Sequence, residues 1–245
     1  MENLNVIIPL LKGGSKHNDL ELKFALRSIE KHLKDYNEIY ILSNYLPNWI
    51  QNVSLVMCPQ NSNKTRNIKT CINNYFEFTQ DENAFFTNDD IFLLKDVSSI
   101  NYPYYYSNKA EQEIANRNNN DIYKRLVIET NKVLNEKGIE KFNYFDIHCP
   151  IRYNKLAFNE YVNKSDWSFK YGLIIKSLYA NQLRIKPIEV EDVCIKEPKR
   201  FEEITSYLLD KVLNKDCFTV HDKAINPSLI KFLNTIYPNK SKYEK

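Results

Sequence analysis

Three adjacent residues, Asn88-Asp89-Asp90, are the part of this sequence best suited to chemistry. They follow a short apolar run at 84–86, and apolar residues resume at once with Ile91. A buried strand that ends in this way places two acids at the edge of a sheet, where open α/β sheets bind their ligands. Such close carboxylates repel each other, and a hard divalent cation with oxygen ligands commonly stabilises them. The alternative is an ordinary acidic turn after a strand.

A second candidate is the basic segment 61–70, Asn-Ser-Asn-Lys-Thr-Arg-Asn-Ile-Lys-Thr. Its apolar positions continue at helical spacing through Ile68 and Ile72, so the cations stand at the start of a predicted helix. Lys and Arg beside the free N–H groups of a helix start suit a phosphate. The alternative is a solvated first turn.

A third candidate is the segment 142–153, in which Asp146 and His148 are two residues apart. In a strand they would share a side. A His near a carboxylate can act as a base, as a metal ligand or as a hydrogen-bond donor to a diphosphate, although a lone His is most often structural. Asp192 and His221 are weaker candidates, chosen because each stands at the end of a predicted strand.

Alternating strands and helices must position these groups. Strands are predicted at 4–11, 38–44 and 53–57, and a helix at 19–36 with its apolar face on Leu22, Leu26, Ile29 and Leu33. Asn18 or Asp19 is expected to cap this helix, and Arg27 flanks its apolar face as a surface or ion-pair residue. The order indicates a βαβ unit with a parallel sheet.

The later half is predicted to be richer in helix. We expect two helices, or a helix with a mobile loop, within 111–135, and further helices at 167–182, 201–213 and 227–237. Short strands are expected at 183–193 and 217–222. The tyrosines of 101–106 could form a stacking shelf for a sugar or base, but buried aromatic core is the favoured interpretation.

Composition excludes several classes of protein. The length of 245 residues suits one large domain, and a net charge of +3, from 34 basic and 31 acidic residues, does not by itself indicate a nucleic-acid binder. With four Gly, neither a Gly-rich phosphate loop nor a P-loop is present. The five Cys form no C-x-x-C pair, which argues against a zinc site or a disulfide framework. Without a signal peptide or a membrane span, a cytoplasmic protein is expected.

Six segments, in order, resemble phage and bacterial glycosyltransferases related to the Stealth-type sugar-phosphate transferases. The helix at 20–31 is similar to their E-L-x-x-x-L-R-S-I helix, 39–50 to a strand with a following P-x-W-L, and 64–68 to K-x-x-N-I. The stretch 85–93 resembles F-x-x-N-D-D-x-F-L, 146–151 resembles the H-x-P segment, and 232–244 resembles F-L-x-x-x-F-P-x-x-S-x-Y-E.

This resemblance implies an α/β fold of the GT-A (Rossmann-like) type. Its central mixed, mostly parallel sheet would be flanked by helices, with a helical C-terminal part. The single domain would span 1–245, with a nucleotide-binding half at 1–97 and an acceptor and catalytic half at 98–245.

The resemblance also assigns roles to the candidate residues. Catalytic roles fall to Asp89 and His148, and binding of the nucleotide or phosphate falls to Lys64, Arg66, Asn67 and Asn88. Asp192 is a weaker catalytic candidate, chosen only because it ends a predicted strand. Asp90 would bind Mn²⁺ or Mg²⁺ directly. His221 is a weaker metal candidate, chosen only because it ends a predicted strand. His148 would lie at the sugar or the diphosphate, as acid/base or as a metal ligand.

The implied activity is metal-dependent transfer of a sugar from a nucleotide-diphospho-sugar, UDP-sugar first, to an acceptor hydroxyl. The acceptor would be a glycan or a modified base of phage DNA, and a phage enzyme would work in the host cytoplasm. The alternatives are a sugar-phosphate transferase of the Stealth type and a non-catalytic nucleic-acid-binding protein. Stealth proteins usually carry an additional N-terminal acidic motif, which is not found here, so glycosyl transfer is favoured.

Overall fold

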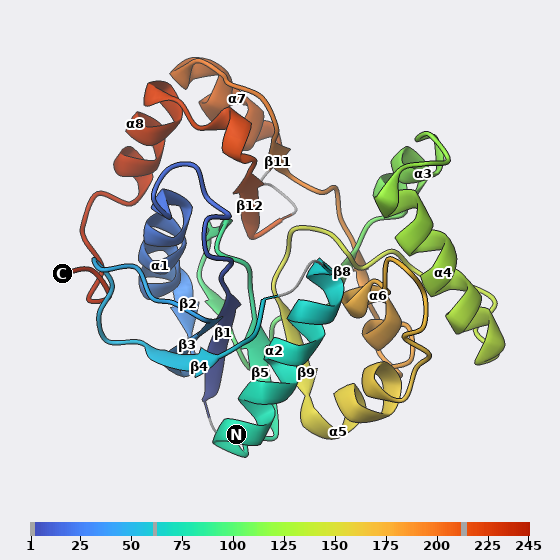
Figure 1. Cartoon of the computed structure of the whole chain (residues 1–245). Coiled ribbons are helices and arrows are strands. Elements are labelled where there is room, and N and C mark those ends of the chain that lie inside the picture. The colour runs from blue at the N-terminus through green and yellow to red at the C-terminus, as the bar shows by residue number, and fades with distance from the viewer. Residues whose placement is uncertain (1–2, 61–62, 212–214) are drawn as a thin grey trace.

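The computed structural model describes residues 3–60, 63–211 and 215–245 and shows a mixed α/β fold with a mostly parallel central sheet (Figure 1). The expected segment start at Asn61 and the expected helix end at Leu213 lie outside these residues. The α-helices of the described chain are α1 (Leu20–His32), α2 (Lys64–Thr79), α3 (Asn108–Ala115), α4 (Ile122–Glu136), α5 (Lys155–Phe158), α6 (Ile175–Ala180), α7 (Phe201–Lys211) and α8 (Pro227–Ile236).

The central sheet has five strands in the order β4-β3-β1-β5-β9. Its strands are β1 (Leu4–Pro9), β3 (Tyr36–Ser43), β4 (Ser54–Met57), β5 (Asn83–Phe86) and β9 (Ile151–Asn154). The first four are parallel, and β9 runs antiparallel to β5. The chain adds strands on one side of β1 and then crosses to add β5 on the other side. The sheet therefore has a topological switch point between β1 and β5.

Alternate side chains of β1 enter two separate cores. Val6 and Ile8 pack in a cluster with the apolar face of α1, whereas Ile7 packs in a cluster with the apolar side chains of α2. Residues of a strand alternate between the two faces of the sheet, so each face is covered by its own helix. This is the layered arrangement that a nearly continuous apolar β1 predicts.

A small C-terminal sheet lies beside the central one. It joins β6 (Ile91–Leu93), β12 (Cys217–Val220) and β11 (Cys194–Ile195), with β12 antiparallel to β6. Phe92 and Phe218 of this sheet share a third core with α7 and α8. Because β6 directly follows the Asn88–Asp90 turn, this sheet carries the C-terminal part of the chain to the acidic site. The remaining short strands are β2 (Leu33–Lys34), β7 (Val97–Ser98), β8 (Tyr105–Tyr106) and β10 (Ile188–Glu189).

The expected helix at 167–182 is wrong over most of its length, because only Ile175–Ala180 is helical. Gly172 has a φ of +88°, a left-handed backbone conformation that a right-handed helix cannot contain. The carbonyl oxygens of Trp167 and Phe169 accept hydrogen bonds from the Arg66 guanidinium, at 2.7 and 3.0 Å. Arg66, which is distant in sequence, therefore occupies carbonyl oxygens that would accept hydrogen bonds from backbone N–H groups of the same segment if it were helical.

The two helices expected within 111–135 correspond to α3 and α4, which form the lobe at the right of Figure 1. Tyr102 and Tyr105 are buried at 1% and 9% exposure, as the core interpretation predicts. Within the described ranges, no helix is both long and apolar enough to cross a membrane.

The C-terminal tail is held by a buried ion pair with α1. Arg27 donates two hydrogen bonds to the Glu244 carboxylate, at 2.7 and 2.8 Å, and the side chains are 12% and 4% exposed. The N–H of Ser241 donates to the same carboxylate. Burial alone would raise the pKa of Glu244, but the hydrogen bonds from Arg27 and Ser241 lower it below its usual value.

We predict that Glu244→Gln lowers the free energy of unfolding by about 3 kcal/mol, because it leaves the Arg27 cation buried without its counter-charge. A depressed carboxyl pKa stabilises the fold above the unfolded-state value, and this stabilisation is lost as the pH falls through the folded-state value. The difference between variant and wild type should therefore shrink in acid. Urea denaturation at a series of pH values measures it.

The matched control is Glu160→Gln. Glu160 pairs with Lys164 on the surface, where side chains are 57% and 63% exposed, and such pairs add little to stability. Equal unfolding midpoints for Glu244→Gln and Glu160→Gln would contradict a stabilising role for the tail.

Candidate active site

The Asn88–Asp90 turn lies at the carboxyl end of β5, at the switch point. The N–H of Thr87 donates to the Ile7 carbonyl of β1 at 3.1 Å, so the turn starts while still paired with β1. The N–H of Ile91 closes it by donating to the Asn88 carbonyl at 3.4 Å. In open α/β sheets ligands bind in this position, outside the carboxyl ends of the strands. Asn88 is half-buried here.

The two acids of the turn lie in an environment of burial and electrostatic repulsion. Burial, followed by the charges of Asp90 and Glu21, raises the pKa of Asp89 to about 8, and the Lys64 cation opposes this rise. The Oδ1 atom of Asp90 is buried and has no hydrogen-bond partner. A buried oxygen without a partner is costly, so this atom is suited to accept a ligand that carries positive charge.

Two further carboxylates, Glu21 and Asp222, extend the acidic group. Glu21 is 5% exposed and accepts a hydrogen bond from the Ser15 hydroxyl at 2.8 Å, while its other oxygen is buried without a partner. Burial, followed by the neighbouring Asp222 carboxyl group, raises the pKa of Glu21 to about 7. Sequence reasoning missed both residues, because an acid in a first helical turn ordinarily serves the helix dipole.

Asp19 does not cap α1 with its side chain, in contrast to the expectation. Asn18 and Asp19 both adopt left-handed backbone conformations, with φ of 56° and 55°. The Asp19 carboxylate instead accepts a hydrogen bond from the Tyr45 hydroxyl at 2.9 Å. Consecutive non-Gly residues in this conformation store strain of the kind that concentrates at functional sites. The cap was predictable in position but not in side-chain geometry.

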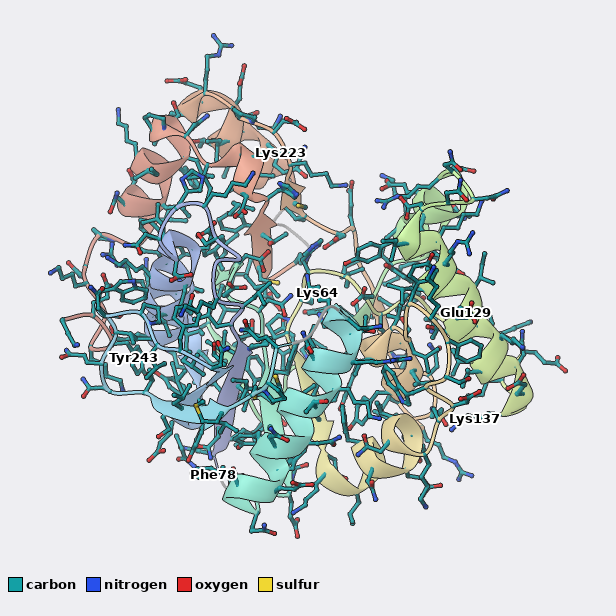
Figure 2. All side chains as sticks on the ribbon, viewed as in Figure 1. Lys64, Phe78, Glu129, Lys137, Lys223 and Tyr243 are labelled. Carbon is teal, nitrogen blue, oxygen red and sulfur yellow. The ribbon has the colours of Figure 1, made fainter. Side chains whose placement is uncertain are left out.

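The start of α2 carries Lys64, which is exposed and lies near the middle of the view in Figure 2. Asn63 caps this helix by accepting from the Arg66 N–H at 3.0 Å, and the Asn67 N–H donates to the Asn63 carbonyl. Lys64 lies near enough to Asp89 to oppose the rise in its pKa. The Arg66 guanidinium donates to the carbonyls of Trp167 and Phe169 and holds a loop, and its binding of a phosphate stays a prediction.

The structure brings His148 and Asp192 together, although 44 residues separate them. The His148 Nδ1 lies 2.6 Å from the Asp192 Oδ2, and the His148 N–H donates to Oδ1 at 3.1 Å. The expected partner was Asp146 on a shared strand, but His148 lies in a bend outside any strand. The His148 side chain is 39% exposed, which leaves Nε2 for a ligand.

Although burial opposes its charge, hydrogen bonds and ionic contacts with His148 and Lys215 hold the pKa of Asp192 well below its usual range. Asp192 is therefore an anion at neutral pH. An ionised carboxylate on Nδ1 keeps the proton of a neutral imidazole there and leaves Nε2 as a proton acceptor. Lys215, which sequence reasoning missed, belongs to this group.

His221 is exposed, and its Nδ1 accepts the Lys223 N–H at 3.2 Å as the cap of a short 3₁₀ turn, Asp222–Ala224. In the part of the chain that the structure describes, no three His, Cys, Asp or Glu side chains are arranged to hold a metal ion.

The α3–α4 lobe contributes a tyrosine to the site's surroundings. The Asp146 carboxylate, then burial, raises the pKa of Tyr123 to about 12, and Asp90 adds to this rise. Tyr123 stands in the first turn of α4 and is 43% exposed. The first turn of α4 therefore lies near enough to Asp90 for its charge to act on Tyr123.

A cavity of about 610 Å³ lies away from these groups. It is lined mainly by residues near the amino ends of the parallel strands, the end of the sheet opposite to the acidic turn. Its lining includes Asn5, Asp81 and Arg152 and contains none of the candidate site residues. Chemistry and position at the switch point, rather than cavity size, identify the site.

Comparison with known proteins adds no assignment: no family model and no curated protein matches this sequence.

We predict that Asp89→Asn stabilises the protein at high pH. A carboxyl group whose pKa is raised in the folded state stabilises the fold below its unfolded-state value, and that contribution is lost as the pH rises to the folded-state value, about 8 here. The Asn variant loses nothing over this window. Its free energy of unfolding should exceed that of wild type by about 1 kcal/mol or more at pH 8.5, with a smaller gap at pH 5.

Thermal denaturation in a chelator, at both pH values, measures this difference. The matched control is Asp96→Asn. The Asp96 side chain is 64% exposed and pairs with His32, the last residue of α1. A variant Asp89→Asn that is less stable than wild type at pH 8.5 would show that Asp89 is not under stress.

Proposed function

We propose that this protein is a divalent-cation-dependent glycosyltransferase with a GT-A-like fold, which uses a nucleotide-diphospho-sugar, UDP-sugar first, as donor. The observation that carries the proposal is the Asn88–Asp90 turn at the switch point, with the buried, unpartnered Oδ1 of Asp90. The segments that resemble phage glycosyltransferases support the same activity. The acceptor would be a hydroxyl of a glycan or of a modified DNA base.

The residues present fit Mn²⁺ or Mg²⁺ shared with a substrate. Asp90, with Asp89 beside it, would hold the cation, and Mg²⁺ in particular is commonly bound by one or two carboxylates, substrate phosphates and water. When bound, the cation would neutralise charge that builds on the leaving diphosphate.

The start of α2 would hold the phosphates. Lys64 supplies a cation, and the first N–H groups of the helix supply hydrogen-bond donors and the positive end of the dipole. Lys64 acts on the charge of Asp89, so the start of α2 lies near the acids of the Asn88–Asp90 turn. The diphosphate would therefore lie between positive charge from α2 and the cation held by the acids.

His148 would accept a proton from the acceptor hydroxyl at Nε2, since Asp192 occupies Nδ1. The acceptor oxygen forms a bond to the anomeric carbon of the sugar, and the bond from that carbon to the diphosphate oxygen breaks. The nucleoside diphosphate leaves with the electron pair. The proton moves from the hydroxyl to the imidazole.

Titration calorimetry of UDP in the presence of Mn²⁺ tests the proposal. We expect Asp90→Ala to weaken UDP binding at least about 10-fold, a loss of about 1.4 kcal/mol, because the cation loses its main protein ligand. Asp96→Ala, which removes an exposed acid at the other end of α1, should bind as wild type does.

Equal UDP affinity in wild type and Asp90→Ala would refute the site assignment. Mass spectrometry of the nucleotide released from a UDP-sugar then separates the reaction types. UDP is the product of glycosyl transfer, whereas UMP would mean that the sugar phosphate is transferred and that the proposed reaction is wrong.

A further inference from the structure

The backbone around His148 is held by buried side chains from separate parts of the chain. Lys176 of α6, 6% exposed, donates to the carbonyls of Ile147 and Cys149 at 2.9 and 2.8 Å. The Cys217 thiol of β12 donates to the His148 carbonyl at 3.5 Å. The His148 N–H is bonded to Asp192. All three carbonyls and the central N–H of this bend are therefore paired.

The second buried lysine acts through the carboxylate. Lys215, 1% exposed, donates from Nζ to the Asp192 Oδ1 at 2.9 Å. The same oxygen accepts the His148 N–H, so Oδ2 is left facing Nδ1. Each oxygen of Asp192 thus has a defined partner, and rotation of the carboxylate would break all three contacts.

Buried lysines are expensive, and their presence in pairs calls for a reason. Taking an ammonium group out of water costs several kcal/mol, and a well-packed apolar residue would often be as stable or more stable. Burial opposes the charge of Lys215, but the Cys149 and Cys217 thiols and Asp192 raise its pKa, so it remains a cation. Both lysines support the short bend that carries His148, Lys176 directly and Lys215 through Asp192.

We propose that Lys215 and Lys176 are positioning residues that hold His148 as a single Nδ1-protonated tautomer with Nε2 directed to the reacting group. This inference rests on the proposed function for its role in transfer, but the ring geometry that it claims does not. Lys176 fixes the backbone of the bend, and Lys215 orients Asp192. Neither lysine touches the substrate in this arrangement.

Long-range ¹H–¹⁵N spectra of the imidazole rings test the proposal, because the two neutral tautomers differ in their ring nitrogen shifts. The signal of His148 is assigned by its loss in His148→Gln. We expect wild type to show the Nδ1–H tautomer alone. In Lys215→Met the single tautomer should be lost, since Asp192 is free to turn away from Nδ1.

Lys137→Met is the matched control, because Lys137 is exposed at the far end of α4 (Figure 2). The His148 ring spectrum of the Lys137→Met variant should equal that of wild type. A folded Lys215→Met protein with an unchanged His148 spectrum would overturn the proposal. If Lys215→Met does not fold, Asp192→Asn decides by the same criterion, since it keeps an acceptor for Lys215 and removes the ionised partner of Nδ1. If neither folds, the group serves folding and the proposal is wrong.

Turnover supplies the second readout. With Mn²⁺ and UDP-glucose as the probe, Lys215→Met should lower kcat for release of UDP about 100-fold and leave KM unchanged, because positioning of a general base affects the chemical step. A raised KM with unchanged kcat would contradict positioning. A wild-type protein that neither binds nor cleaves nucleotide sugars would end the proposed function, whereas the ring spectra would still decide the tautomer.

Discussion

Repulsion between carboxylates is the constraint around which this molecule is arranged. Asp89, Asp90, Glu21 and Asp222 gather at the switch point, and burial makes their mutual repulsion stronger than it would be in water. The two cores on either face of the sheet must be stable enough to hold these groups in place. Two of the acids respond with raised pKa values, which means that they keep protons at a pH where isolated carboxyls are ionised. A ligand that brings positive charge would release this stress.

In the group around His148, by contrast, the charges are balanced by other side chains of the protein. Around His148 a half-buried anion, Asp192, lies between an imidazole and a buried ammonium group, and both of its oxygens have partners. One half of the site is therefore electrostatically unsatisfied and the other half is satisfied within the protein. In an enzyme this division is reasonable, since groups that bind charged ligands must remain available and groups that move protons must be rigidly held.

The segments that resemble known glycosyltransferases fall into two structural classes. The turn at 88–90 and the bend at 146–151 carry the candidate residues Asp89, Asp90 and His148. The helix with Arg27, the segment with Trp49 and the tail with Glu244 instead contact one another, through the Arg27–Glu244 pair and through the Lys245 N–H bonded to the Trp49 carbonyl. In these segments Arg27, Trp49 and Glu244 therefore attach the C-terminal tail to α1, whereas Glu21 of the same helix joins the acidic group. Arg66 shows that one segment can contain both kinds of residue, because it stabilises a loop while its neighbour Lys64 lies near the acids.

The sequence by itself determined the elements whose signals are local. The apolar run of β1, the periodicity of α1 and the apolar stretch before Asn88 predict strand, helix and an acidic sheet edge, since each pattern reflects burial of neighbouring residues. The tertiary structure decided which distant groups meet. Asp192 rather than Asp146 contacts His148, Glu21 and Asp222 join the acids, and Lys215 is buried, because strand order and β6–β12 pairing bring these positions together. Residues 167–173 are irregular for the same reason: their carbonyls satisfy Arg66 from another helix, and such a long-range contact leaves no periodic trace in the segment itself.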